Sequence, residues 1–186
     1  DYSWTNIGMF SAAFGKNVKA KGEFSFVAGD SSQANGKYAI AMGDKNIANG
    51  DRSVLLGALN SDGSGNPDVV LIGNGNNATG KETYIIGKDN FIAAGKQHYF
   101  AGHENKNTGG GDNNYMIGFG NKAQGSVNFA FGYLDSISGN FAFGIGNQNK
   151  VAGGNSYAFG KENIIQGQDG YAIGTKGHIG VTANNS

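Results

Sequence analysis

Glycine recurs every seven residues along most of this chain. It occupies positions 8, 15, 22, 29, 36, 43 and 50, and with small slips the spacing continues to Gly174. A period of seven does not indicate a coiled coil here, because each glycine inside a helix costs about 1 kcal/mol relative to alanine. Glycine instead lets a chain turn sharply. The sequence therefore predicts a regular series of corners with short extended segments between them.

Two kinds of segment alternate between these glycines. One kind ends in three apolar or aromatic residues, as in Val54-Leu55-Leu56 and Phe129-Ala130-Phe131. The other kind is mostly polar, with one small or branched apolar residue about two places before its glycine: Ala20, Ala34, Ala48, Ala78, Ala93, Ala123, Ile137 and Ile165. The repeat is therefore fourteen residues with two strands. About twelve such turns, stacked at about 4.8 Å, predict an all-β solenoid about 55 Å long.

The apolar triplets carry a prediction about assembly. A strand that is apolar on both faces is normally covered on both. One face lines the interior of the roll, and the middle residues of the triplets are assigned to the other face. Exposed on a monomer, this column would be a large apolar patch, so we expect it to meet copies of itself. The predicted interface residues are Val27, Leu55, Leu71, Ile85, Phe100, Met116, Ala130, Ala158 and Ala172.

Asparagine occupies a fixed place in the repeat. The third residue after the triplet glycine is Asn46, Asn60, Asn76, Asn90, Asn105, Asn121, Asn149 or Asn163 in eight of twelve turns. Asparagine tolerates the left-handed backbone region and bonds to nearby main-chain groups. Stacked repeats are therefore expected to place these side chains in a ladder along one edge.

The composition limits the function classes. Fourteen basic and fourteen acidic residues cancel, so charge gives no reason to expect nucleic acid or an anionic membrane surface as partner. Cysteine is absent, which fits an exported protein without disulfides. We find no signal sequence or long apolar run in the chain and expect any membrane anchor to lie in a region outside it.

Several triplets resemble a known repeat. Ser53-Val54-Leu55-Leu56-Gly57, Asn128-Phe129-Ala130-Phe131-Gly132 and Ser156-Tyr157-Ala158-Phe159-Gly160 are similar to the S-V-A-I-G repeat of YadA-like heads in trimeric autotransporter adhesins. The likeness covers nearly the whole chain. It implies a left-handed parallel β-roll, a homotrimer, and a stalk and outer-membrane anchor at a bacterial surface. Residues 1–180 would form the head, with an N-terminal cap at 1–10, and 181–186 a polar tail toward a neck.

The resemblance also implies a non-catalytic function. Heads of this family bind extracellular-matrix proteins or cell-surface receptors, such as CEACAM-type immunoglobulin-like receptors. An alternative is a structural spacer or a self-association module of the same fibre. A third hypothesis is a carbohydrate-processing solenoid, which would need paired carboxylates such as Asp62 with Asp68.

Two slips of the repeat are candidate binding loops. Gly57 and Gly73 are sixteen positions apart instead of fourteen, and so are Gly102 and Gly118. Loops on a rigid scaffold often bind partners, although solenoids also tolerate insertions that have no function. The candidate residues in these slips are Asn60, Asp62, Asn66, Asp68, His103, Glu104 and Asn105.

A second set of candidates consists of apolar residues without an inward register: Ile47, Phe91, Phe119, Tyr133 and Ile164. If they align along one face they would form a stripe suited to a protein partner; scattered singly they would be ordinary surface residues. The three histidines have no recurring metal-ligand spacing, so no metal, cofactor or catalytic residue is predicted.

Overall fold

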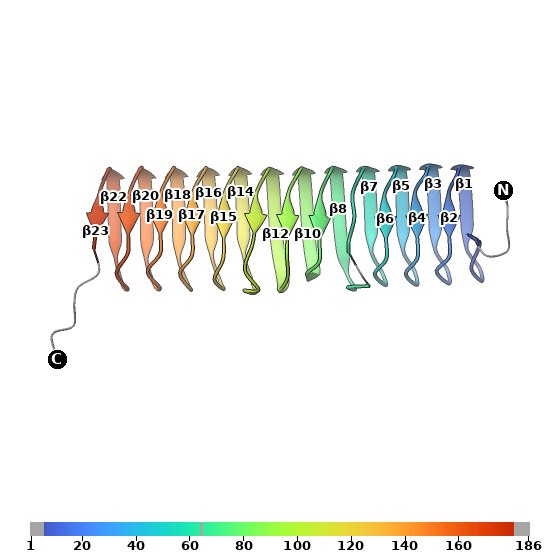
Figure 1. The fold of residues 1–186 in the computed structure, drawn as a ribbon, viewed down its shortest axis with the longest axis horizontal. Helices are drawn as coiled ribbons and strands as arrows, with labels where there is room; N and C mark the ends of the chain where they lie inside the picture. Colours follow the sequence, from blue (N-terminus) through green and yellow to red (C-terminus); the bar gives the residue numbers. More distant parts are fainter. Residues whose placement is uncertain (1–5, 64, 181–186) are drawn as a thin grey trace.

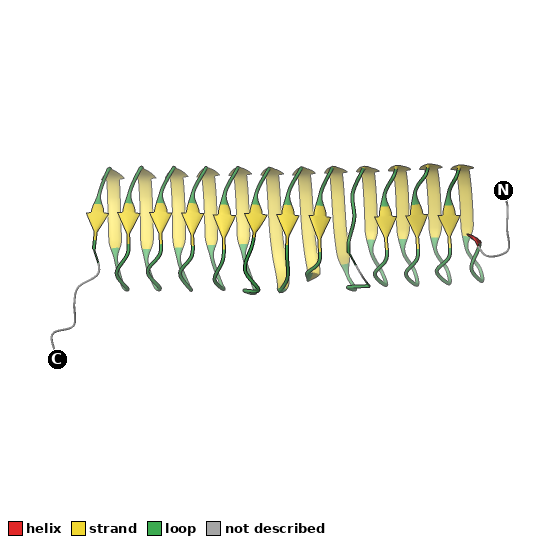
Figure 2. Ribbon diagram, in the orientation of Figure 1, coloured by secondary structure: helices red, strands yellow, loops and turns green. Residues whose placement is uncertain are grey.

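The computed structural model describes residues 6–63 and 65–180. These residues wind into a rod of stacked turns, with β1 (Ala12–Lys16) near one end and β23 (His178–Ile179) at the other (Figure 1). Strands and turns make up nearly all of it (Figure 2). None of the helices in this range is of a length and hydropathy that would cross a membrane.

Each turn of the rod contains one long and one short strand. The long strands form a twelve-stranded parallel sheet in chain order. They are β1, β3 (Phe26–Asp30), β5 (Ile40–Asp44), β7 (Val54–Ala58), β8 (Val69–Asn74), β10 (Lys81–Lys88), β12 (Lys96–His103), β14 (Tyr115–Phe119), β16 (Phe129–Tyr133), β18 (Phe143–Asn147), β20 (Tyr157–Lys161) and β22 (Tyr171–Thr175). Glycine pairs with glycine throughout, as Gly29 does with Gly43, which confirms the fourteen-residue repeat.

The short strands form a second layer in two parallel sheets of three and eight strands. They are β2 (Lys19–Ala20), β4 (Gln33–Ala34), β6 (Ile47–Ala48), β9 (Asn77–Ala78), β11 (Phe91–Ile92), β13 (Lys106–Asn107), β15 (Lys122–Ala123), β17 (Ser136–Ile137), β19 (Lys150–Val151), β21 (Ile164–Ile165) and β23. Ser61 bridges both Ile47 and Asn77, so the layer is continuous between the two sheets.

Two corners complete each turn. The first corner follows the long strand, as at Gly29 and Ser31, and the second follows the short strand, as at Gly22 and Phe24. In both, the residue two places after the glycine has the left-handed conformation, with φ of 54° at Ser31 and 57° at Phe24. A Cβ on Gly22 would lie 1.8 Å from the carbonyl oxygen of Gly36. The glycines are thus required mainly because successive corners approach so closely.

The predicted interface column is wrong, because these side chains form the core of the roll. Val27, Leu55, Leu71, Ile85, Phe100, Met116, Ala130 and Ala158 are fully buried and Ala172 is 6% exposed within a single chain. The first and third residues of each triplet point outward instead. Since all three positions are apolar, the triplet alone does not show whether the middle residue or the two outer residues face inward. A shift of one residue exchanges the two faces of the strand.

The short strands supply the opposite wall of the core. The inward residue predicted from the polar segments is buried in every case except Ala93, whose place is taken by Ile92. Side-chain sizes are complementary across the interior in several turns. Where the long strand contributes Gly144, a Cβ would lie 3.1 Å from the Cδ1 of Ile137 in the facing layer. Small residues on one wall thus leave room for large ones on the other.

The asparagine ladder is confirmed. The Asn60 Nδ2 donates to the Oδ1 of Asn46 at 3.0 Å and to the carbonyl oxygen of Gly73 at 2.9 Å. The Asn60 Oδ1 in turn accepts from the main-chain N of Asn76 at 3.1 Å. The asparagines face the interior, and the left-handed residue is the one before each of them, such as Lys45. They satisfy corner carbonyls that the strands leave unpaired.

The cap and tail predictions are only partly testable. Tyr2 and Trp4 of the predicted cap at 1–10, and the predicted tail at 181–186, lie outside the described residues. Ile7 already bridges Ala20, and the Gly8 N donates to the carbonyl oxygen of Ala20 at 2.7 Å. The pairing pattern of the roll therefore begins by residue 7.

Candidate functional site

The outward side of the long-strand sheet, which we call the outer face, is apolar along the rod. Every side chain in its two columns is apolar or aromatic. The first column is Ala12, Phe26, Ile40, Val54, Val70, Tyr84, Tyr99, Tyr115, Phe129, Phe143, Tyr157 and Tyr171; the second is Phe14, Ala28, Met42, Leu56, Ile72, Ile86, Ala101, Ile117, Phe131, Ile145, Phe159 and Ile173. At about 4.8 Å per strand, the face runs about 50 Å along the rod.

An aromatic ladder occupies one end of this face. Tyr115, Phe129, Phe143, Tyr157 and Tyr171 stack with ring centroids 4.6 to 5.1 Å apart. These rings order one another along the rod, while their outward edges remain open. Since exposed apolar patches larger than a few hundred Å² mark interaction sites, the outer face is a candidate interface for a protein partner.

The first predicted loop is much smaller than expected. The insertion lies in the second corner, between Ser61 and β8, and the residues before it keep the ordinary path, since Asn60 bonds within the ladder and Ser61 bridges Ile47. Asn60 belongs to the buried ladder, and Asp62 is fully buried. The Asp62 carboxylate accepts from the main-chain N atoms of Asn49 at 2.6 Å and Gly50 at 2.9 Å. Neither Asn60 nor Asp62 is therefore available to a partner, and pairing Asp62 with Asp68 as catalytic carboxylates is wrong.

Asp62 shows how the roll accommodates the insertion. In an ordinary second corner, the main-chain N atoms of Asn35 and Gly36 both donate to the carbonyl oxygen of Ala48. The Asp62 side chain replaces that carbonyl where the insertion displaces it. Burial raises the pKa of Asp62, and the two main-chain hydrogen bonds oppose this shift.

Asn66 and Asp68 lie on the second corner, where Asn66 stacks on Gly50 and Asp68 has the left-handed conformation, with φ of 62°. The Asn66 side chain donates to the carbonyl oxygen of Thr79. Asp68 accepts two hydrogen bonds from the guanidinium of Arg52, at 2.6 and 2.7 Å. These bonds lower the pKa of Asp68 and raise that of Arg52.

The second insertion lies within the predicted range from Gly102 to Gly118, but the candidate residues chosen from that range lie at the other corner. His103, Glu104 and Asn105 belong to the first corner, whereas the two extra residues lie within 108–110 at the second. Asn105 is a fully buried member of the ladder. The repeat spacing alone located the insertion only between two glycines, because either corner could have absorbed it.

The structure brings four predicted residues together, with Leu134 beside them. We call His103, Glu104, Phe119, Tyr133 and Leu134 the first-corner cluster. The His103 ring meets the Phe119 ring edge-on at 5.2 Å, and Phe119 stacks on Tyr133 at 5.2 Å. The His103 Nε2 lies 3.3 Å from the Glu104 Oε1. Tyr133 is 46% exposed and Leu134 38%, so the cluster is an accessible mixture of aromatic and charged groups.

The other predicted apolar residues do not form a stripe. Ile47, Phe91 and Ile164 share one outward column of the short-strand layer, but Ser61 and Asn77 separate the first two. Four further residues, Lys106, Lys122, Ser136 and Lys150, stand between Phe91 and Ile164. Phe119 and Tyr133 lie elsewhere, at the first corner.

Sequence reasoning missed an aromatic stripe at the second corner. Phe10, Phe24 and Tyr38 are exposed, and successive rings stack at 5.0 and 5.2 Å. The Lys37 Nζ lies 5.2 Å from the centre of the Tyr38 ring and forms a salt bridge with Glu23. The signal was available, since each ring falls two places after a corner glycine. The stripe borders the outer face, because Tyr38 comes two residues before Ile40.

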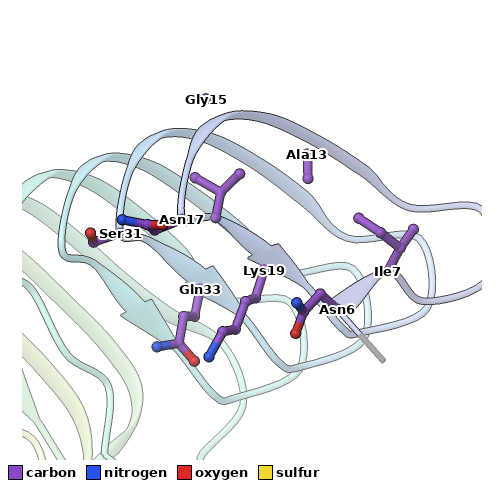
Figure 3. Close-up of a pocket in the computed structure, with 9 residues that line it drawn as sticks. Asn6, Ile7, Ala13, Gly15, Asn17, Lys19, Ser31 and Gln33 are labelled. Carbon is purple, nitrogen blue, oxygen red and sulfur yellow. The ribbon is translucent and has the colours of Figure 1, made fainter. Parts of the chain in front are cut away.

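A cavity of about 400 Å³ opens at the N-terminal end of the roll. Ile7 and Ala13 line one side of it, and the polar side chains of Asn6, Lys19 and Gln33 line another (Figure 3). It continues the interior of the roll beyond β1. Across residues 6–63 and 65–180, the structure has no group of three or more His, Cys, Asp or Glu side chains placed to bind a metal ion.

His98 is part of a buried polar group beneath the second insertion. Its Nδ1 accepts from the main-chain N of Asn114 at 3.3 Å, and its Nε2 lies 3.0 Å from the carbonyl oxygen of Ala94. The Asn107 side chain bonds across the insertion to the carbonyl oxygen of Gly111 at 3.3 Å. Burial lowers the pKa of His98 from its ordinary value near 6.5. The folded chain therefore favours the neutral imidazole.

The substitution His98→Asn is expected to reduce the loss of stability at acid pH. Asparagine occupies the equivalent position in the next two turns, as Asn114 and Asn128. A lowered pKa contributes stability that is present above the unfolded value and is lost as the pH falls below it. Thermal unfolding between about pH 7.5 and about pH 5 should show a smaller fall in melting temperature for His98→Asn than for the parent. The exposed His178→Asn is the control. Equal slopes for the parent and His98→Asn would contradict the prediction.

A comparison with protein-family models identifies part of the repeat. The family model of the YadA head domain repeat matches the chain in two copies, at residues 20–46 and 34–58. Residues 20–58 therefore carry two YadA head repeats. YadA-like heads come from surface trimeric autotransporter adhesins, and the family is one of adhesins and not of enzymes. A comparison with curated proteins found no match to the chain.

The geometry of the matched residues continues beyond them. β3 to β7 lie within the matched segment, and the same parallel pairing continues from β8 to β23. The YadA head repeat indicates an adhesin-like function for the chain.

Proposed function

We propose that this chain is the head of a homotrimeric bacterial surface adhesin that binds a host protein without catalysis. The observation that carries the proposal is the outer face, two uninterrupted columns of apolar and aromatic side chains along the rod. Three left-handed rolls placed side by side would cover these columns. An outer-membrane anchor outside this chain would hold the trimer at the cell surface.

The revised interface consists of the first and third triplet residues. These side chains are apolar throughout, and many are large and already ordered by stacking. Ordered aromatic side chains lose little conformational entropy on association. The aromatic stripe of Phe10, Phe24 and Tyr38 would lie at the border of this interface.

Host binding is proposed at the first-corner cluster, which lies beside the outer face because His103, Phe119 and Tyr133 end long strands of that sheet. Tyrosine and other aromatic side chains with charged neighbours are common centres of protein–protein interfaces. The partner class is an extracellular-matrix protein or an immunoglobulin-like receptor of the CEACAM type. Three copies on one rod would raise the apparent affinity through multivalency.

The double substitution Phe119→Ala and Tyr133→Ala is expected to weaken adhesion about tenfold or more, because truncating central aromatic residues often costs 2 kcal/mol or more of binding free energy. Binding of the trimeric head to immobilised matrix proteins and receptor ectodomains measures the effect. Phe91→Ala, an exposed aromatic residue outside the cluster, is the control. Parent-like binding by the double variant would remove the cluster as the site.

The same assay separates adhesion from the alternative function. A spacer or self-association module would show no saturable binding to any host protein, and head-to-head association alone in sedimentation. Saturable binding by the parent supports the adhesin proposal whichever surface is used.

A further inference from the structure

One position of the buried asparagine ladder is an aspartate. Asp135 lies at the first corner between β16 and β17 and is fully buried. Its main-chain N donates to the Asn121 Oδ1 at 2.9 Å. Its Oδ1 accepts from the main-chain N and the Nδ2 of Asn149 at 2.8 and 3.0 Å. This oxygen therefore does what an asparagine oxygen does in the ladder.

The other carboxyl oxygen stands where the ladder needs a donor. In the next turn, the Asn149 Nδ2 donates to the side chain of Asp135 and to the carbonyl oxygens of Ile145 and Gly160, at 3.3 and 3.0 Å. The Asn121 Nδ2 donates to the corresponding atoms one turn earlier.

By the same register, the Oδ2 of Asp135 faces the Oδ1 of Asn121 and the carbonyl oxygens of Phe131 and Gly146. All three atoms are acceptors. The Asp135 Oδ2 is buried and has no hydrogen-bond partner. An ionised carboxylate there would place a buried charge against oxygen lone pairs, which is strongly unfavourable. A protonated oxygen would supply the missing donor.

We propose that Asp135 carries a proton in the folded head and donates it from Oδ2 into the ladder, so that this turn is a buried proton-binding site. Asn121, Asp135 and Asn149 then form an unbroken chain of hydrogen bonds. The proton restores the donor that an asparagine would bring, and its loss leaves a buried negative charge at one turn of the rod.

Within residues 6–63 and 65–180, none of the salt bridges involves Asp135. The side chain packs near Gly144 and Ile137, which carry no charge. Lys122 in β15 and Lys150 in β19 are the charged residues of the adjacent short strands, and both are exposed in the outward column. On the adjoining long strands, Tyr133 ends β16 at the surface. Burial raises the pKa of Asp135, against the hydrogen bonds from Asn149.

The sign of the pH effect follows from this arrangement. The folded chain binds the Asp135 proton more tightly than the unfolded chain does. The resulting stabilisation is complete below the ordinary aspartate value of 3.8 and is lost as the pH rises through the folded pKa. This dependence is opposite to that of His98, so each needs its own variant.

Asp135→Asn is the decisive variant, because it restores the ladder donor without a proton. The parent should lose melting temperature relative to Asp135→Asn as the pH rises from about 5 to about 9, by about 3 °C or more. The exposed Asp169→Asn is the control and should keep the parent slope. Equal pH slopes for the parent and Asp135→Asn would overturn the proposal.

Spectroscopy gives a second, independent readout. The infrared difference between the parent and Asp135→Asn near pH 5 should contain the carbonyl stretch of a protonated carboxyl group, and Asp169→Asn should leave this band in place. A difference spectrum that shows only an ionised carboxylate would overturn the proposal even if the thermal slopes differ. Converting Asn149 to aspartate should add a second band of the same kind.

Discussion

Replacing Gly118 with valine is expected to prevent the head from folding cooperatively. The new Cβ would lie 1.9 Å from the carbonyl oxygen of Gly132 in the next turn, and Gly118 has φ of 123°. The main chain at Gly118 and at Gly132 cannot move apart without displacing the turns stacked on either side of them. Main-chain overlap together with a strained conformation places this variant among the largest single-residue effects, about 4 kcal/mol or more.

Gly110 supplies the matched control for this prediction. A Cβ on Gly110 meets no atom within 4 Å, because the residue lies in the second insertion. Gly110→Val is therefore expected to change the free energy of unfolding by less than about 1 kcal/mol. Circular dichroism and urea titration of both variants measure the difference. Native-like unfolding of Gly118→Val would show that the corners do not need close approach of their backbones.

The double substitution Ile86→Asp and Ile117→Asp is expected to convert the proposed trimer into single chains. Both side chains are exposed on the outer face of one chain, at 47% and 41%. Their replacement should therefore leave the roll folded. In a trimer they would place six unpaired carboxylates in an apolar interface, and each buried charge without a partner costs several kcal/mol.

Light scattering across a dilution series measures this effect. The parent is expected at three times the chain mass and the double variant at one. Ile164→Asp, on the outward side of β21, is the control and should keep the parent mass. A parent that stays a single chain at every concentration would refute the trimer, and a trimeric double variant would place the interface elsewhere.

Much of the fold could be predicted from local spacing. Gly29 and Gly43 differ by fourteen residues and pair directly in the sheet. Asn46 and Asn60 hold the same place in successive repeats and bond to each other. In a solenoid, residues one period apart are neighbours in space, so a repeat in the sequence is already a set of tertiary contacts.

The candidate site was harder to predict, because the exposure of its residues depends on the direction in which each side chain points as well as on the spacing of the repeat. The first-corner cluster joins His103 from one presumed loop with Phe119 and Tyr133 from a separate group of apolar residues. The signal was available, because each of the three residues directly follows the glycine of an apolar triplet and so holds the same place in successive turns. Asparagine and aspartate are residue types typical of exposed loops. Asn60, Asp62 and Asn105 are nevertheless buried, because their side chains form hydrogen bonds with main-chain groups at the corners.

The sequence by itself determined the fourteen-residue repeat, the two strands of each turn and the asparagine ladder, since these depend only on periodic spacing. Only the tertiary structure decided which triplet residues face inward, which corner absorbs each insertion and how Asp135 meets its neighbours. In an apolar triplet such as Val54-Leu55-Leu56, either the middle residue or the two outer residues could face the interior of the roll. The choice is made by packing against the facing short strand, whose side chains fix the volume available inside the roll.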